Sequence, residues 1–193
     1  MNDKPLYPLS VGQEAAELAI EMIKPVCRQV AIAGSVRRKR PQVRDVDLVI
    51  WPEYEVVVVQ QQLSLFITEH RPSYQATGLL HLARKLGWDA WDANTWPGIV
   101  RIPTSEESSL AVERIPIELY ICEPDGSNFD ALWQMRTGSA EYNIRLAKRA
   151  QELGLKYRAG YGIFEGERRM DDGTEEGIFA ALSLQYVPPE KRG

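Results

Sequence analysis

The clearest alternation of apolar and polar residues runs from position 45 to position 51. One side of this segment holds the apolar residues Val46, Leu48 and Ile50, and the other side begins with Asp45 and Asp47. A period of two is typical of a strand with one buried face. A second β-prone run, 29–33, stops at a Gly-Ser pair that is typical of a turn. These two patterns predict neighbouring strands joined by a turn.

The remaining patterns predict more helices than strands. A capping box at Ser10 and Gln13 predicts a helix that Pro25 ends or kinks. Valines at 56–59 favour a strand locally, but the length of the segment favours a helix over 54–70. Further helices are predicted at 77–86, 129–136, 139–153 and 174–182, and strands at 99–102 and 110–122.

The predicted elements indicate an α+β protein with two parts. The run Pro124, Asp125 and Gly126 is typical of a break between subdomains. We therefore expect one part over 1–126 and a second part over 127–193. No internal repeat is visible in the sequence.

The composition of the chain excludes several classes of protein. The chain has 193 residues, of which 44% are hydrophobic and 26% charged, values that exclude a disordered chain or a fibre. The formal net charge is −4, so any contact with nucleic acid must be local. No signal or membrane-crossing segment is visible, and Cys27 and Cys122 lack a metal-binding or redox spacing. We expect an intracellular protein without a membrane partner.

The paired aspartates suggest metal chemistry. Asp45 and Asp47 share one face of a strand, with Cα atoms roughly 6.6 Å apart. Carboxylate oxygens suit Mg²⁺ or Mn²⁺, and two-metal phosphoryl chemistry needs bridging carboxylates. Glu118 lies in an apolar predicted strand and is the preferred third carboxylate, with Glu113 as the alternative. A solvent-exposed strand edge is the simpler interpretation of an isolated Asp-x-Asp pair.

The turn before the aspartates supplies donors for phosphate. Gly34 allows close approach to the backbone, Ser35 offers a hydroxyl, and Arg37 and Arg38 offer planar guanidinium groups. Binding of a nucleoside triphosphate requires hydrogen-bond donors to its phosphates, placed beside metal ligands. An ordinary solvated basic turn is the alternative, and residues 39–40 fit that alternative.

Taken in order, these motifs resemble the nucleotidyltransferase signature of family X DNA polymerases, the DNA polymerase beta group. The matching segments are 34–38 followed by 45–47, then the Arg-Thr-Gly-Ser run 136–139 with Asn143, and the C-terminal segments 174–179 and 188–190. The resemblance implies a palm with a mixed β-sheet and helices over 1–126. It implies a small α/β thumb over 127–193, with no lyase or fingers domain.

The resemblance also implies roles for individual residues. Catalysis and binding of two Mg²⁺ or Mn²⁺ ions would fall to Asp45, Asp47 and Glu118. The bound dNTP would contact Gly34, Ser35, Arg38, Arg44, Gly138 and Asn143. Three positions depart from the family pattern: Glu118 replaces an aspartate, Arg44 replaces a glycine, and Met135-Arg136 replaces an aromatic pair. The implied activity is addition of dNMP to a primer 3′-hydroxyl on a primer-template or gapped duplex.

A local basic field would hold the DNA. The candidate contacts are Arg136, Arg145, Lys148 and Arg149, in a segment where basic residues outnumber acidic residues. An ordinary solvated helix face is the alternative. Trp88, Trp91 and Trp96 offer stacking surfaces, although core packing is the favoured interpretation. We expect a monomer that fills short gaps in DNA.

Two other functions remain open from the sequence. The same palm chemistry serves nucleotidyltransferases that use no template or that modify other acceptors. The glutamate at 118 also leaves open a catalytically weakened DNA-binding relative.

Overall fold

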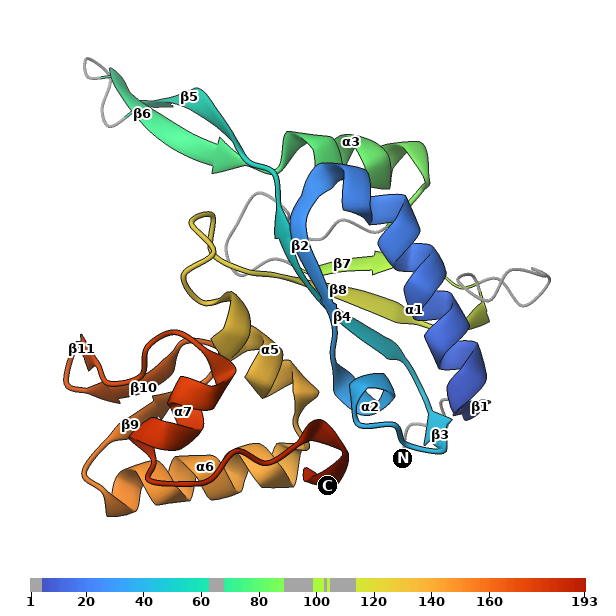
Figure 1. The fold of residues 1–193 in the computed structure, drawn as a ribbon. Coiled ribbons are helices and arrows are strands. Elements are labelled where there is room, and N and C mark those ends of the chain that lie inside the picture. Colours follow the sequence, from blue (N-terminus) through green and yellow to red (C-terminus); the bar gives the residue numbers. More distant parts are fainter. Residues whose placement is uncertain (1–4, 63–67, 89–98, 103, 105–113) are drawn as a thin grey trace.

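A computed structural model describes residues 5–62, 68–88, 99–102, 104 and 114–193. Figure 1 shows a sheet-based N-terminal part beside a smaller part built from the C-terminal third of the chain. The α+β class predicted from the sequence is confirmed. Within the described residues, the helices are too short or too polar to cross a membrane.

The N-terminal part is built on a mixed four-stranded sheet. Its strand order is β2 (Cys27–Ile32), β4 (Val46–Pro52), β8 (Ile117–Ile121) and β7 (Ile99–Ile102). The central pair β4 and β8 is parallel, and the two outer pairs are antiparallel. Three of the strands were predicted at nearly these bounds, while β8 begins at Ile117 rather than at residue 110.

One face of the sheet packs against two helices, α1 (Leu9–Ile23) and α3 (Thr77–Lys85). The apolar side of β4 is fully buried in this core, as the alternation predicts: Val46, Leu48 and Ile50 are all 0% exposed. Burial of that face fixes the register of β4, because a slip by one residue would exchange its two faces.

The opposite face of the sheet packs against α5 (Phe129–Thr137) through Phe129 and Leu132. Val49 and Tyr120 lie in the same cluster. Since successive side chains of a strand alternate, Asp47 of β4 lies on this α5 side. The sheet therefore carries its acidic residues on the face that meets the C-terminal part.

The start of α1 differs from the prediction. The helix begins at Leu9 with Pro8 as its N-cap, and no side chain caps it. Strand β1 (Tyr7–Pro8) pairs with β3 (Gln42–Val43), and the Leu9 amide donates to the Pro41 carbonyl at 3.0 Å. Pairing with β3 therefore fixes the helix start one residue before Ser10. Pro25 follows the helix, in the short 3₁₀ turn η1 (Lys24–Val26).

The helix predicted over 54–70 is wrong. This segment forms a hairpin of β5 (Glu55–Gln62) and β6 (Thr68–Gln75), paired antiparallel in register along their full length. Four consecutive valines lose rotamer freedom in a helix and fit a pleated strand better, so the local preference prevails over the length argument. Figure 1 shows this hairpin projecting away from the sheet.

Some predictions lie outside the described residues. Trp91, Trp96 and the alternative carboxylate Glu113 are among them. Trp88 is described: it is 8% exposed and packs in the core beneath α3, in agreement with the packing interpretation.

The C-terminal part has its own core. Helices α6 (Ala140–Glu152) and α7 (Glu175–Ala181) pack on a sheet of three antiparallel strands. These strands are β9 (Lys156–Arg158), β10 (Gly162–Glu165) and β11 (Arg168–Arg169). Both helices start one residue after the predicted residues, Ser139 and Thr174, which are the N-caps and whose side chains accept hydrogen bonds from backbone amides. Helix α5 contributes to the cores of both parts.

A buried ion network joins the two parts. Glu175 of α7 accepts two hydrogen bonds from Arg37 at 2.8 and 2.6 Å, and one from Arg192 at 2.6 Å. Arg37 belongs to the short helix α2 (Gly34–Arg37), which follows β2, and Arg192 follows the 3₁₀ turn η2 (Pro189–Lys191). Burial alone would raise the pKa of Glu175, but the two guanidinium groups hold it below its usual range. The network therefore ties α2 to the C-terminal part by charge.

Candidate active site

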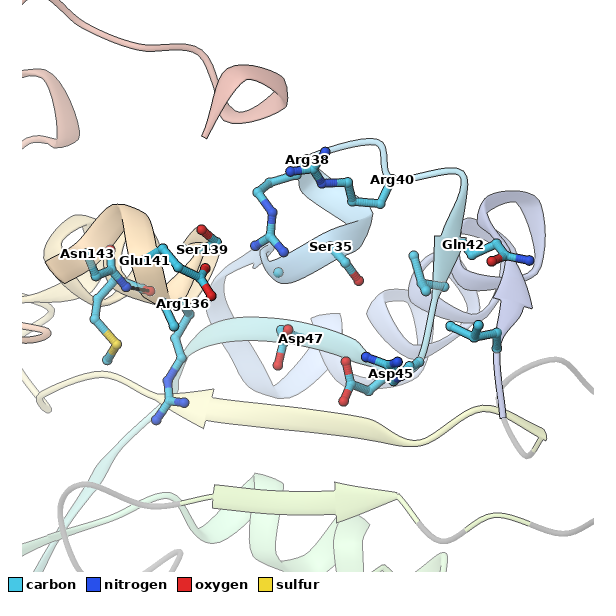
Figure 2. A pocket seen from close by; sticks show the side chains of 17 residues that line it. Ser35, Arg38, Arg40, Gln42, Asp45, Asp47, Arg136, Ser139, Glu141 and Asn143 are labelled. Atoms are coloured by element: carbon cyan, nitrogen blue, oxygen red, sulfur yellow. Dashed lines mark hydrogen bonds between the residues drawn. The ribbon is translucent and has the colours of Figure 1, made fainter. Parts of the chain in front are cut away.

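A polar cavity of about 730 Å³ lies where α2 and the start of β4 face the junction of α5 and α6. Figure 2 shows Asp45 and Asp47 below Ser35, with Arg38 above them and Asn143 and Glu141 on the α6 side. Most of the predicted site residues line this cavity: Gly34, Ser35, Arg38, Arg44, Asp45, Asp47, Arg136, Gly138 and Asn143. The fold thus brings together residues that are more than 100 positions apart.

Gly34 is required by the close approach of the turn to β4. Its φ is +57°, which favours glycine, and a β-carbon at this position would overlap the Asp47 carboxylate. The Ala33 amide also donates to the Asp47 carbonyl at 2.8 Å. The absence of a side chain at Gly34, the predicted phosphate contact, therefore makes room for the Asp47 carboxylate.

The turn presents buried donors without partners. Ser35 Oγ and Arg38 Nε are both buried and have no hydrogen-bond partner among the described residues. The guanidinium of Arg38 also donates to the Thr137 carbonyl, which fixes its direction. Burial and the neighbouring Arg40 lower the pKa of Arg38. Buried donors without partners are costly, and an anionic ligand in the cavity would satisfy them.

The carboxylates repel one another. Burial, followed by the charges of Asp45 and Glu118, raises the pKa of Asp47 to about 7. Glu118 lies directly opposite Asp47 in the parallel β4–β8 pair, and its carboxylate accepts a hydrogen bond from the Tyr120 hydroxyl. Asp45 and Asp47 line the cavity, whereas Glu118 is not among the residues that line it. The three predicted carboxylates are therefore close neighbours, with Glu118 beside Asp47 on the same face of the sheet.

The carboxylate oxygens at the site are chemically suited to bind a divalent cation. Across the described ranges, no three His, Cys, Asp or Glu side chains gather into an assembled metal site. The raised pKa of Asp47 nevertheless reports negative charges held together in a buried place, which a cation would relieve. Carboxylate oxygens from Asp45 and Asp47, with Glu118 beside them, are ligands of the kind that Mg²⁺ and Mn²⁺ prefer.

The raised pKa of Asp47 predicts an unusual pH dependence. Between about pH 4 and pH 7 the folded protein binds a proton here that the unfolded chain has lost. We expect the metal-free protein to lose stability as the pH rises through this window, by up to about 1.4 kcal/mol for each unit of pKa shift. Urea denaturation at pH 5, 6, 7 and 8 checks this, with Asp47→Asn as the comparison. Equal slopes against pH in the two proteins contradict the prediction.

The α5–α6 junction forms the other wall of the cavity. Gly138 has a φ of +64° and lies next to the Arg38 guanidinium, so the wall comes close to the turn of α2. The Asn143 amide group donates to the Met135 carbonyl at 2.8 Å and accepts from Gln134 at 3.2 Å. Asn143 therefore faces the cavity while being held by α5.

The four predicted DNA-binding residues lie in different places. Arg136 lines the cavity. Arg145 and Lys148 are exposed on α6, with Arg145 stacked 5.1 Å from the Tyr142 ring centre. Arg149 is half-buried and donates to the Leu182 carbonyl at 3.2 Å, so it has a structural role within the C-terminal part.

Several residues at or beside the site were not predicted as site residues, among them Arg40, Glu141 and Tyr120. Arg40 and Glu141 line the cavity, although Arg40 was interpreted as part of a solvated turn. Its neighbour Lys39 fits that interpretation, since it is exposed and pairs with Glu190 at 2.7 Å. Tyr120 lies two residues further along the same strand face and donates a hydrogen bond to Glu118.

Comparison with known proteins agrees with the motif analysis. The family description "DNA polymerase beta thumb" matches residues 132–193. The structure is similar to that of polymerase beta from Leishmania infantum, solved as a ternary P/T complex. Sequence identity is 18% and the TM-score 0.64, over 98% of this chain and 77% of that chain. The resemblance to family X DNA polymerases is therefore confirmed for the fold and for the thumb segment.

Proposed function

We propose that this chain is a DNA-directed DNA polymerase that adds dNMP from a dNTP to a primer 3′-hydroxyl, in gap-filling synthesis of the repair type. One observation carries the proposal. One cavity brings two buried hydrogen-bond donors that lack a partner among the described residues, Ser35 Oγ and Arg38 Nε, together with the carboxylates of Asp45 and Asp47. The similarity of the fold to a polymerase beta supports the same function.

Different residues of the cavity would contact different parts of the dNTP. In this proposal the triphosphate binds Ser35, Arg38 and Arg44, with Gly34 allowing its approach to the backbone. The sugar and base lie against Gly138 and Asn143 on the opposite wall.

Asp45, Asp47 and Glu118 would hold two Mg²⁺ or Mn²⁺ ions. When bound, such ions activate the attacking hydroxyl and neutralise charge on the phosphates. The protein contributes by placing the carboxylates beside the groups that bind the phosphates. The primer 3′-hydroxyl and the α-phosphate would then meet between the carboxylates and those groups.

The duplex would lie along the exposed side of α6. We propose a palm over 1–126 and a thumb over 127–193, acting as a monomer, with Arg145 and Lys148 as the phosphate contacts. Cys27 and Cys122 are unpaired, which agrees with work in a reducing, intracellular setting.

The salt dependence of DNA binding tests the α6 contacts. Each phosphate contact contributes about 0.9 to the slope of log K against log salt concentration on duplex DNA. We expect the double variant Arg145→Ala/Lys148→Ala to weaken binding and to lower this slope by about 2. Fluorescence anisotropy from 50 to 200 mM KCl measures it. The exposed Lys85 of α3 provides the control, since Lys85→Ala should leave the slope unchanged; an unchanged slope in the double variant excludes α6.

The activity itself is tested by extension of a labelled primer on single-nucleotide-gapped DNA, with one dNTP at a time and with Mg²⁺ or Mn²⁺. Extension with the complementary dNTP alone supports the proposal. Extension regardless of the template base indicates a template-independent transferase. Binding of DNA without extension under either metal indicates a weakened relative, and Glu118→Asp is then the variant to test for restored activity.

A further inference from the structure

A second cavity, of about 550 Å³, lies at the other end of the sheet from the candidate active site. Asp45 precedes the first residue of β4, whereas Glu123 follows the last residue of β8, its parallel partner. Strand β4 has 7 residues, so the two places are roughly 20 Å apart along the sheet. The lining comes from the end of β6, the loop between β8 and α5, and the turn between β9 and β10. The lining residues are Tyr74, Glu123, Pro124, Asp125, Ser127 and Tyr161.

The lining of the second cavity is aromatic and acidic. Tyr74 and Tyr161 are 56% and 38% exposed, so their rings are open to a ligand. Glu123 and Asp125 supply two carboxylates, and among the residues that the structure describes no lysine, arginine or histidine lines the cavity. Arg169 lies nearby, where it donates to a backbone carbonyl of the same loop at 2.8 Å. Aromatic faces and carboxylates both attract positive charge, so the lining is complementary to a cationic group.

The loop that carries the two carboxylates is held in place. The Trp51 indole N–H donates to the Pro124 carbonyl at 3.0 Å, and the Glu123 amide donates to Asn128 at 2.7 Å. The Tyr161 hydroxyl donates to the Glu123 carboxylate at 3.1 Å, which sets a ring and a carboxylate of the cavity side by side. A carboxylate can accept several hydrogen bonds, so this one leaves room for a further donor. A wall that is already ordered lowers the cost of binding.

The β5–β6 hairpin offers a strand edge beside the second cavity. The two strands pair with each other and, among the described strands, with no other. Tyr74 lies near the end of β6, where Figure 1 shows the hairpin leaving the rest of the N-terminal part. An extended segment can add to an open strand edge, and its alternate side chains then enter neighbouring pockets. This arrangement favours a polypeptide over a free cation as the occupant.

We propose that the second cavity receives an arginine side chain from an extended segment of a partner protein. The planar guanidinium would lie against the rings of Tyr74 and Tyr161 and donate to the Glu123 carboxylate. Asp125 lies at the exposed rim, where its charge would attract a basic segment. Duplex DNA does not fit this place, because the carboxylates repel phosphates. The inference does not rest on the proposed function, since none of these residues lines the candidate active site.

Fluorescence anisotropy of a labelled peptide tests the inference on the full chain, without DNA or metal. The probe is Thr-Val-Thr-Arg-Thr-Val-Thr, blocked at both ends, and a matched peptide has glutamine in place of arginine. We expect the arginine peptide to bind at least about tenfold more tightly, because glutamine makes neither the charged hydrogen bond nor the cation–aromatic contact. Glu123→Gln should weaken binding of the arginine peptide about tenfold, and Tyr74→Ala about threefold.

Each variant has a control with a matched change. Glu17→Gln removes an exposed carboxylate from α1, which packs on the face of the sheet opposite α5. Ile144→Ala truncates an apolar side chain of α6 that is 56% exposed, as Tyr74 is. Neither residue lines the second cavity, so both controls should bind the arginine peptide as the wild type does.

The outcomes decide between occupants. Equal affinity for the arginine and glutamine peptides overturns the inference, as does the absence of binding up to about 1 mM arginine peptide. Unchanged affinity in both Glu123→Gln and Tyr74→Ala also overturns it, and if Glu123→Gln does not fold, Tyr74→Ala decides. Spermidine is titrated against the bound peptide, and a Kd for spermidine below that of the peptide overturns the inference in favour of a small cation. Primer extension is scored separately, so its failure refutes the polymerase proposal without deciding this inference.

Discussion

Replacing Asp47 with asparagine is expected to lower metal-dependent primer extension by more than about a hundredfold, since loss of a group one step removed from a metal already costs about 10–100-fold. Asp47 lines the cavity beside the phosphate turn, and asparagine keeps its shape while removing the charge. The free protein should fold normally, because asparagine removes a negative charge that burial, Asp45 and Glu118 disfavour at this position. The rate is measured by single-turnover extension with saturating dNTP and Mg²⁺.

Asp125→Asn serves as the control for Asp47→Asn. Asp125 is an exposed carboxylate in the loop before α5, and an asparagine there can still accept from the Ser127 amide. Its extension rate should stay within about twofold of wild type, as for surface changes away from a site. Extension by Asp47→Asn at a rate near that of Asp125→Asn would show that the reaction does not use this carboxylate.

Replacing Glu175 with glutamine is expected to destabilise the protein by about 3–5 kcal/mol, because it leaves buried arginines without a counter-charge. Arg192 is 0% exposed, and the Arg37 side chain is 11% exposed. Both guanidinium groups would keep their positive charge next to a neutral amide. For a chain of this length the melting temperature should fall by about 10 °C.

The neighbouring Glu176 provides the control for Glu175. It lies in the same helix turn but is exposed, so Glu176→Gln should change the melting temperature by little. Calorimetry of both variants under one buffer condition makes the comparison. A loss in Glu175→Gln no larger than that in Glu176→Gln would mean that the network contributes no net stability.

The parts of the fold that follow from local pattern were predictable. The alternation in β4 predicted its bounds to within one residue and the separation of its acidic and apolar faces, because burial of one face imposes a period of two. The helix starts at Ser139 and Thr174 were predictable for a similar reason, since an N-cap side chain satisfies backbone donors within four residues.

The parts of the fold that depend on contacts between distant residues could not be predicted from local pattern. The β5–β6 pair is decided by the pairing of residues 55–62 with residues 68–75, which the pattern within either segment alone does not report. The Glu175 network joins residues 138 positions apart, and nothing in the sequence near Glu175 distinguishes it from Glu176. Likewise, the place of Arg136 against Tyr120 follows only from the packing of α5 on the sheet.

The contact between Gly34 and Asp47 has a thermodynamic consequence. The turn approaches the carboxylate so closely that a β-carbon on residue 34 would overlap it. On the proposed function, a phosphate that displaces the turn would also alter the affinity of Asp47 for a cation. By linkage the effect is reciprocal: the factor by which a phosphate changes cation binding equals the factor by which the cation changes phosphate binding. On the proposed function, the absent β-carbon of Gly34 would therefore couple phosphate binding to cation binding.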